Sequence, residues 1–200
     1  TIVVVAHVQA VPEDSKRWGA GCHDTAMAPS DPLRPLLDAA REGDDVAVTR
    51  LVRRTQADVW RLCSALGSKG EEEDLVQETY LRALRSLDGF RGDSSVRTWL
   101  MAVARNVCAD HVRHRERRRR LIERIRPLPG DSVTQPREPI DDLLAQITPD
   151  RREAFAMTQL LGLPYEEAAV LLECPIGTVR SRVARARADL LALVRDVQAI

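Results

Sequence analysis

Arginine residues gather beside a predicted buried stripe near the C-terminal end of the chain. Apolar residues recur every three or four positions after Pro175, a spacing that predicts one buried face of a helix. These residues are Val179, Val183, Ala186 and Leu190. The positions beside them carry cationic, polar and small side chains: Arg180, Ser181, Ala184, Arg185 and Arg187. An arginine can donate to both acceptors of a guanine, so a face of this kind suits a DNA major groove.

A short apolar helix is predicted over residues 165–172, and a tight connection joins it to the arginine-bearing helix. This arrangement is a helix-turn-helix, in which the second helix enters the major groove. The alternative is an ordinary helical hairpin whose basic face is only solvated.

Two further groups of side chains have spacings that suit binding. Asp74, Gln77 and Glu78 share one face of a predicted helix, where carboxylates one turn apart can pair with arginines of a partner. A solvated acidic helix end is the alternative. The next predicted helix carries Asn106, whose amide can both donate to and accept from a base edge, or simply occupy the surface. The same helix carries candidate phosphate ligands: Arg97, Arg105 and Arg113.

The charge of the chain is unevenly distributed. Its 30 basic and 30 acidic residues cancel, yet residues 91–126 contain 11 arginines and 4 acidic residues, a local charge of +7. Residues 71–74 are entirely acidic. Such a chain can contact a polyanion with one surface and a basic protein with another.

The elements that must position these groups are helices. Ala, Leu, Val and Arg abound while aromatic residues make up 4% of the chain, which favours an all-α fold. Prolines at four positions between 127 and 139 predict a flexible linker. We therefore expect two small helical domains, over 33–126 and 140–200, the second a helix-turn-helix. Residues 1–32 are expected to be a disordered extension, with Met27 a plausible start.

The sequence contains no complete set of residues for catalysis or for metal binding. The four cysteines lie far apart without a Cys-x-x-Cys pair, so we expect buried thiols. Asp110, His111 and His114 share one helix, but no His-Glu-x-x-His or Cys/His set completes a metal site. The apolar run at residues 2–6 is too short to span a bilayer. We expect no catalytic residue, no metal, no cofactor and no membrane insertion.

Three motifs in a fixed order resemble a known family. They lie at residues 74–79 with 81–83, at 97–100 with 104–106, and at 165–169 with 174–182. With the proline-rich segment between them, they are similar to bacterial sigma factors of the extracytoplasmic-function group (group 4) of the sigma-70 family. The resemblance covers about residues 36–195, and residues 109–111 and 158–163 resemble the mycobacterial C-type subgroup.

The resemblance implies an alternative sigma factor, not an enzyme, that acts in the cytoplasm with core RNA polymerase and promoter DNA. The first domain would bind polymerase through Asp74, Gln77 and Glu78 and read the −10 element as a single strand. Asn106 matches the family position that helps to read a flipped −10 base. The second domain would read the duplex −35 element through Arg180, Ser181, Ala184 and Arg185. An anti-sigma factor remains open as a further partner.

Two positions depart from the family pattern, and two other classes of protein compete with it. Ala184 offers only a methyl contact, and Pro164 stands where the family often has a capping serine. A repressor or response regulator would need a ligand pocket or an aspartate-bearing α/β receiver, and neither pattern is present. A pure interaction module would leave the two predicted base-reading helices unexplained.

Overall fold

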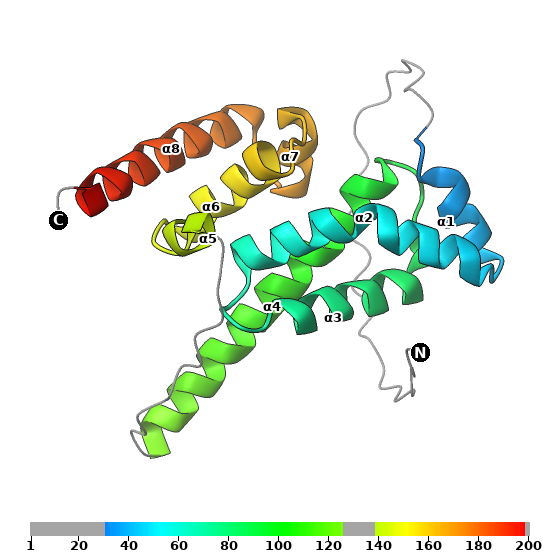
Figure 1. Cartoon of the computed structure of the whole chain (residues 1–200), viewed down its shortest axis with the longest axis horizontal. Helices are drawn as coiled ribbons and strands as arrows, with labels where there is room; N and C mark the ends of the chain where they lie inside the picture. Colours follow the sequence, from blue (N-terminus) through cyan, green and yellow to red (C-terminus); the bar gives the residue numbers. More distant parts are fainter. Residues whose placement is uncertain (1–30, 126–138, 199–200) are drawn as a thin grey trace.

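The computed structural model describes residues 31–125 and 139–198, which form helices and connections without a strand. Figure 1 shows two helical bodies, α1 to α4 and α5 to α8. The first contains α1 (Arg34–Arg41), α2 (Asp45–Leu66), α3 (Glu72–Arg85), the 3₁₀ turn η1 (Leu87–Gly89) and α4 (Val96–Ile125). The second contains α5 (Pro139–Leu144), α6 (Pro149–Phe155), the π turn η2 (Ala156–Leu160), α7 (Tyr165–Leu171) and α8 (Ile176–Gln198).

Short polar signals set the breaks between the first helices. Gly43 has a φ of 89°, a left-handed conformation that ends α1 and confirms the predicted break. The Asp44 carboxylate then accepts from the backbone nitrogens of Val46 and Ala47, at 2.8 and 3.2 Å, and caps α2. The cap satisfies two of the donors that every helix start leaves without an internal partner.

The turn from α2 to α3 requires a glycine because the backbone approaches its surroundings closely. A Cβ at Gly67 would lie 2.5 Å from the carbonyl oxygen of Cys63 and 2.3 Å from the Leu75 side chain. The Cys63 oxygen is part of the α2 backbone and cannot move aside, so a larger residue would distort the end of α2.

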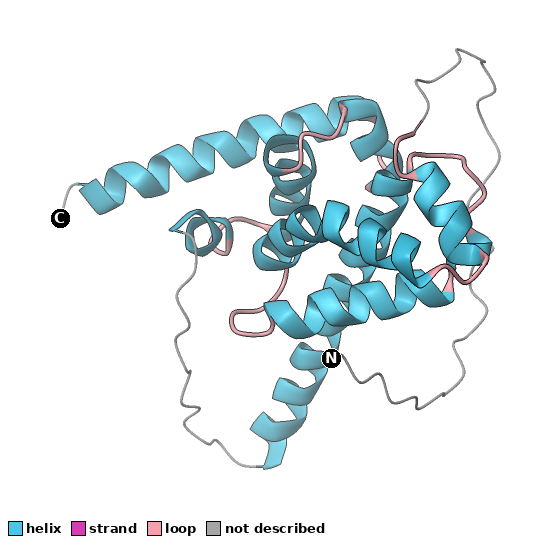
Figure 2. Ribbon diagram, turned by 45° about the vertical axis from the view of Figure 1, so that its right-hand side comes forward, coloured by secondary structure: helices cyan, strands magenta, loops and turns pink. Residues whose placement is uncertain are grey.

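The buried half of α4 lies at the centre of the first body (Figure 2). Ser95 caps this helix by accepting from the Thr98 nitrogen at 3.0 Å. The buried side of α4 then packs against α2 and α3. Trp99 is half-buried and packs against both hydrophobic clusters of the chain, with its ring 5.5 Å from that of Phe90.

The connection between α3 and α4 is held from α1. Arg41 donates to the carbonyl oxygens of Leu87 and Phe90, at 2.8 and 2.6 Å, and its guanidinium lies 5.9 Å from the Phe90 ring centroid. Asp31 accepts from the Val96 nitrogen at 2.6 Å, where α4 begins. The exposed loop over residues 91–94 is therefore fixed at both ends.

The second body has the predicted helix-turn-helix. The segment before the helix-turn-helix forms α6 and η2, and Gly162 ends it with a φ of 66°. Pro164 precedes α7, and no side chain caps that helix. The short turn after α7 includes Glu173, which has a φ of 49°, and α8 follows.

The expected domain boundaries can be compared with the structure at residue 31 and at residue 139. Residues 1–30, which include most of the expected extension, and residues 126–138, which include most of the expected linker, lie outside the described ranges. Asp31, which we assigned to the extension, already bonds to the first body, and α5 begins at Pro139. Cys22 also lies outside.

Two of the expected thiols are buried against each other. Cys63 on α2 and Cys108 on α4 are 0% and 1% exposed, whereas Cys174 is half-buried. The hydrogen bond that the Cys108 thiol donates to the Cys63 sulfur, together with burial, raises the pKa of Cys108 well above its usual range. Cys108 therefore stays protonated at neutral pH and acts as an apolar core residue.

A chain of ion pairs braces α3 against α4. Glu78 accepts from Arg82 at 2.6 Å, and Arg82 also binds Asp110 at 2.7 Å. Asp110 in turn binds Arg113 at 2.5 Å. Burial by itself would raise the pKa of Asp110, but the hydrogen bonds and charges of Arg82 and Arg113 outweigh it and hold that pKa below its ordinary value.

We expect that, in Asp110→Asn, the free energy of unfolding falls less steeply as the pH decreases than it does in the wild type. The depressed pKa of Asp110 gives stability that is present above the unfolded pKa of about 3.9 and is lost as the pH falls through the folded pKa. Because the carboxylate is 46% exposed, water screens the pairs, and the loss at neutral pH should stay below about 1 kcal/mol. Urea unfolding between about pH 2 and pH 7 measures both effects.

Asp93→Asn is the control, because this exposed loop carboxylate has no ion pair within the described part of the chain. Parallel pH profiles for Asp110→Asn and the wild type would show that the brace does not contribute to stability.

Candidate nucleic-acid and polymerase interfaces

The two faces of α8 separate as the spacing predicts. Val179, Val183, Ala186 and Leu190 are 0%, 2%, 0% and 8% exposed, and they pack in the second body. On the outer face the predicted −35 residues Arg180, Ala184 and Arg185 are exposed. The fourth, Ser181, is half-buried and donates to the Thr178 carbonyl oxygen at 2.9 Å.

Other arginines of the second body contact residues on neighbouring helices and so position α8. Arg182 binds Asp150 on α6 at 2.7 Å, and Arg151 binds Asp189 on α8 at 2.6 Å. Arg187 donates to the Gln159 side chain at 2.5 Å. No local sequence pattern identifies these partners, because 28 to 38 positions separate them along the chain.

The acidic face of α3 is only partly available to a partner. Asp74 and Gln77 are exposed, and neither has a charged partner in the described part of the chain. Glu78 is half-buried and already bound to Arg82. The structure thus brings the three predicted polymerase-binding residues to one surface but commits the third to the brace on α4.

The four predicted −10 residues lie along α4 in two environments. Asn106 is exposed, and Arg113 is 65% exposed while it pairs with Asp110. Arg97 and Arg105 instead face the second body and contact it. Asn106, the predicted base reader, therefore remains exposed while the two bodies are in contact. Two of the predicted phosphate ligands, Arg97 and Arg105, are bound to the second body.

These engaged arginines form the polar part of the contact between the bodies. Arg97 binds Asp58 at 2.7 Å and also donates to the Leu161 carbonyl oxygen at 2.6 Å. Arg105 binds Glu153 at 3.0 Å. The sequence does not predict these partners, because residues 48 and 64 positions apart come into contact only in the folded chain.

Further contacts complete the junction of the bodies. Thr98 donates to a carboxylate oxygen of Glu167 on α7, and Lys69 lies 3.7 Å from Asp142 on α5. The hydrophobic cluster at the junction includes residues of α2, α4, η2 and α7. The ion pairs among these contacts are partly exposed, so a competing partner can replace them at modest cost.

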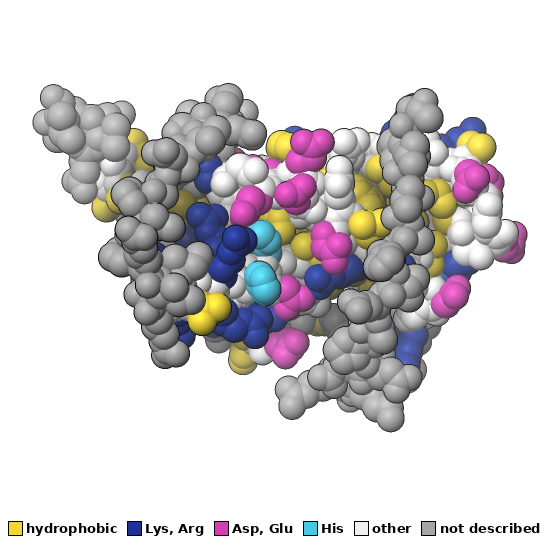
Figure 3. Space-filling view, turned by 90° about the horizontal axis from the view of Figure 1, so that it is seen from below, with side chains coloured by type: hydrophobic (Ala, Val, Ile, Leu, Met, Phe, Trp, Pro, Cys, Tyr) yellow, Lys and Arg dark blue, Asp and Glu magenta, His cyan; other side chains and the backbone are white. Residues whose placement is uncertain are grey.

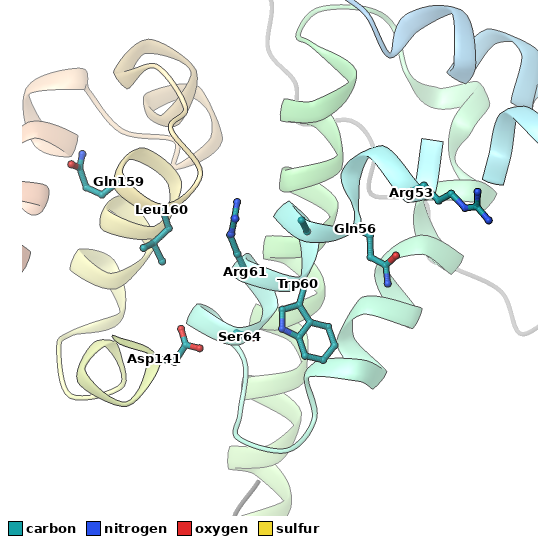
Figure 4. Close-up of a pocket in the computed structure, with 9 residues that line it drawn as sticks. Arg53, Gln56, Trp60, Arg61, Ser64, Asp141, Gln159 and Leu160 are labelled. Atoms are coloured by element: carbon teal, nitrogen blue, oxygen red, sulfur yellow. The ribbon is translucent and has the colours of Figure 1, made fainter. Parts of the chain in front are cut away.

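A cleft of about 760 Å³ opens beside this contact. One face of α2 forms one wall, with Arg53, Gln56 and Trp60, and Gln159 and Leu160 face it from the second body (Figure 4). Trp60 is 45% exposed, a large apolar side chain that the first body leaves uncovered. The bodies are therefore in contact along one edge and open along the other.

Two features bear on other classes of site. In the described ranges, no group of three or more His, Cys, Asp or Glu side chains is placed to hold a metal ion. None of the described helices is both long and apolar enough to cross a membrane.

Comparison with known proteins gives matches over both bodies. Residues 51–118 match the family model of sigma-70 region 2, and residues 137–190 match that of sigma-70 region 4. The sigma factor RpoE of Bartonella quintana, solved with the anti-sigma factor NepR, has a TM-score of 0.64 at 28% identity, covering 74% of this chain and 96% of that chain. CnrH, solved with the cytosolic domain of CnrY, has a TM-score of 0.63 at 27% identity over 82% of this chain and 97% of that chain.

Curated relatives match over most of their length. The ECF RNA polymerase sigma-E factor of Escherichia coli is 34% identical over 169 residues, 76% of this chain and 88% of that protein. The ECF RNA polymerase sigma factor SigC of Mycobacterium tuberculosis is 44% identical over 175 residues, 84% of this chain and 95% of that protein. With both sigma-70 regions present and relatives of this identity along both bodies, the chain belongs to the extracytoplasmic-function group of the sigma-70 family of RNA polymerase sigma factors.

Proposed function

We propose that three surfaces of this chain divide the work of promoter recognition. The exposed acidic face of α3 binds core RNA polymerase, α4 reads the single-stranded −10 element, and α8 reads the duplex −35 element. As a sigma factor, the chain directs promoter-specific transcription initiation with core RNA polymerase and is not an enzyme. We place its action in the cytoplasm, where polymerase and promoter DNA meet.

The observation that carries the proposal is the outer face of α8. Arg180, Ala184 and Arg185 project from a helix whose opposite side is fully buried, so the body holds these side chains in a fixed direction. The ion pairs of Arg182 and Arg151 fix the helix against α6. A rigid helix with this face outward has the form that reads base edges in the major groove.

The contact between the bodies bears on when the chain can read DNA. Arg97 and Arg105 cannot bind phosphates while Leu161 and Glu153 hold them. We propose that core polymerase separates the bodies and sets the distance between the two reading helices. The Bartonella quintana relative was solved with an anti-sigma factor, which supports a protein of that class as a candidate partner here.

Transcription from purified components tests the function as a whole. Core polymerase with this chain should start at promoters that carry both elements, and core alone should not. The free chain should bind the same duplex weakly, because a partner must set the joint geometry of its reading surfaces. Tight footprinting of both elements by the free chain would contradict this.

We expect Asp74→Arg to weaken binding to core polymerase, because the reversed charge adds repulsion where a pair was removed. Asp74 is preferable to Glu78 for this test, since a change at Glu78 would also break the brace to Arg82 and Asp110. Glu73→Arg, one position away on the exposed acidic turn, is the matched control. Equal co-purification of both variants and the wild type with core would show that the α3 face is only solvated.

Two reading variants should fail in different ways. Arg185→Ala should cost about 1–3 kcal/mol at one −35 position and flatten preference there. Asn106→Ala should leave −35 binding unchanged and reduce opening for one −10 base. A promoter library transcribed with each holoenzyme measures both. An equal loss of transcription from all promoters for Arg185→Ala would show that this face of α8 does not read bases.

Loosening the junction should let the free chain bind the single-stranded −10 element more tightly. Glu153→Gln with Glu167→Gln weakens the contacts of Arg105 and Thr98, and we expect about a fivefold gain, equivalent to about 1 kcal/mol. Fluorescence anisotropy with a labelled −10 oligonucleotide measures it. Glu166→Gln with Glu173→Gln removes the same charge from exposed positions of the second body and is the control. Equal gains in both variants would indicate a charge effect without opening.

A further inference from the structure

The C-terminal part of α4 is a helix that no other described element covers. Every side chain at positions 113–121 is exposed, and both ribbon views show this end of α4 projecting beyond the other helices (Figures 1 and 2). Residues 113–120 contain six arginines and one glutamate, a formal charge of +5. We refer to residues 113–120 as the arginine arm.

The rest of the described chain neutralises chiefly the base of the arm. Arg113 pairs with Asp110 at 2.5 Å, and Arg115 lies 3.6 Å from Glu71. Arg117, Arg118 and Arg120 have no ion pair within the described residues. Figure 3 shows Arg and Lys side chains gathered beside the histidines on this face of the molecule.

The arginine arm lacks the interactions that usually stabilise a helix. It is polar on all sides and buries no apolar stripe, and its like charges repel at spacings of three and four residues. It stays helical as the continuation of the packed part of α4, with arginine a good helix former. A surface of this kind is stabilised by a negatively charged partner. DNA is such a partner, because arginines that bind its phosphates release the cations bound there.

We propose that the arginine arm binds the phosphate backbone of the duplex between the −10 and −35 elements, independently of its sequence. This rests on the proposed function of α4 and α8. From Asn106 to Arg120 the helix rises about 21 Å at about 1.5 Å per residue, which corresponds to about six base pairs. The second body, which we assign to the −35 element, follows the arm in the sequence, so we assign the arm to the upstream side of the −10 element.

The distribution of charge favours a duplex over other polyanions. The six arginines surround the helix instead of forming one stripe, as their positions along the turn require. A groove of the duplex presents phosphates on both walls and is wide enough for a helix, whereas an acidic protein face would contact one side. The arm has no Trp, Tyr or Phe on which unpaired bases could stack.

The test compares holoenzymes that contain the wild-type chain or variants of it. Arg117→Gln, Arg118→Gln and Arg120→Gln remove charge from the arm while keeping a helix former at each position. The corresponding Lys variant retains the charge. Arg50→Gln, Arg53→Gln and Arg54→Gln form the matched control, because these exposed arginines of α2 lose the same charge elsewhere. Each holoenzyme is titrated with promoter DNA over a range of salt concentrations, on two spacers of different sequence.

The Gln variant of the arm should bind both promoters more weakly by the same factor. Its plot of log affinity against log salt should be shallower by about 2–3, because each phosphate that the arm no longer neutralises lowers the slope by about 0.9. The Lys variant and the α2 control should keep the wild-type slope. Uncharged methylphosphonates about six base pairs upstream of the −10 element should weaken the wild type but not the arm variant.

Three results would overturn the proposal: an unchanged salt slope, an equal effect of methylphosphonates on the wild type and the arm variant, or weaker binding of the arm variant to core polymerase itself. The last would identify polymerase as the partner of the arm. Failure of the proposed function is distinguishable, because the wild-type holoenzyme would then show no preference for the −10 and −35 elements at any salt concentration.

Discussion

The packing of the first half of α4 between α2 and α3 orients most of the surfaces that concern function. Leu100, Met101 and Val107 are almost completely buried there, and Trp99 joins this core to the cluster around α1. A helix turns by about 100° per residue, so once one side is buried the direction of every other side chain is set. Asn106 therefore faces solvent, while Arg97 and Arg105 face the second body.

Arginine serves opposite purposes along the same chain because its planar guanidinium binds carboxylates, carbonyl oxygens and phosphates alike. Arg182 and Arg151 fix α8 in place, and Arg82 braces α3 against α4. The ion pairs at the junction of the bodies are partly exposed, and such pairs contribute little to stability. A polyanion with many phosphates can thus compete for Arg97 and Arg105.

Local spacing was sufficient to predict the long helices and the buried stripe of α8, but not the short helix α5. Gly43, Ser95 and Gly162 end or begin helices where their chemistry suggests, and Val179 and Val183 are buried as expected. These features depend on interactions within a few residues, which a sequence displays directly. The resemblance to the family adds the roles that we expect of these surfaces, which spacing alone does not give.

The sequence by itself determined an all-helical chain with an arginine-bearing helix-turn-helix and an acidic helix face. Only the tertiary structure decided that Glu78 is committed to Arg82, that Arg105 is bound to Glu153, and that the arm beyond Arg113 is covered by no other described helix. Periodicity reports which side of a helix is buried, but it does not report which distant residue lies opposite. Ion pairs between residues tens of positions apart, and the exposure of a helix that continues past its packing partners, are properties of the packed chain alone.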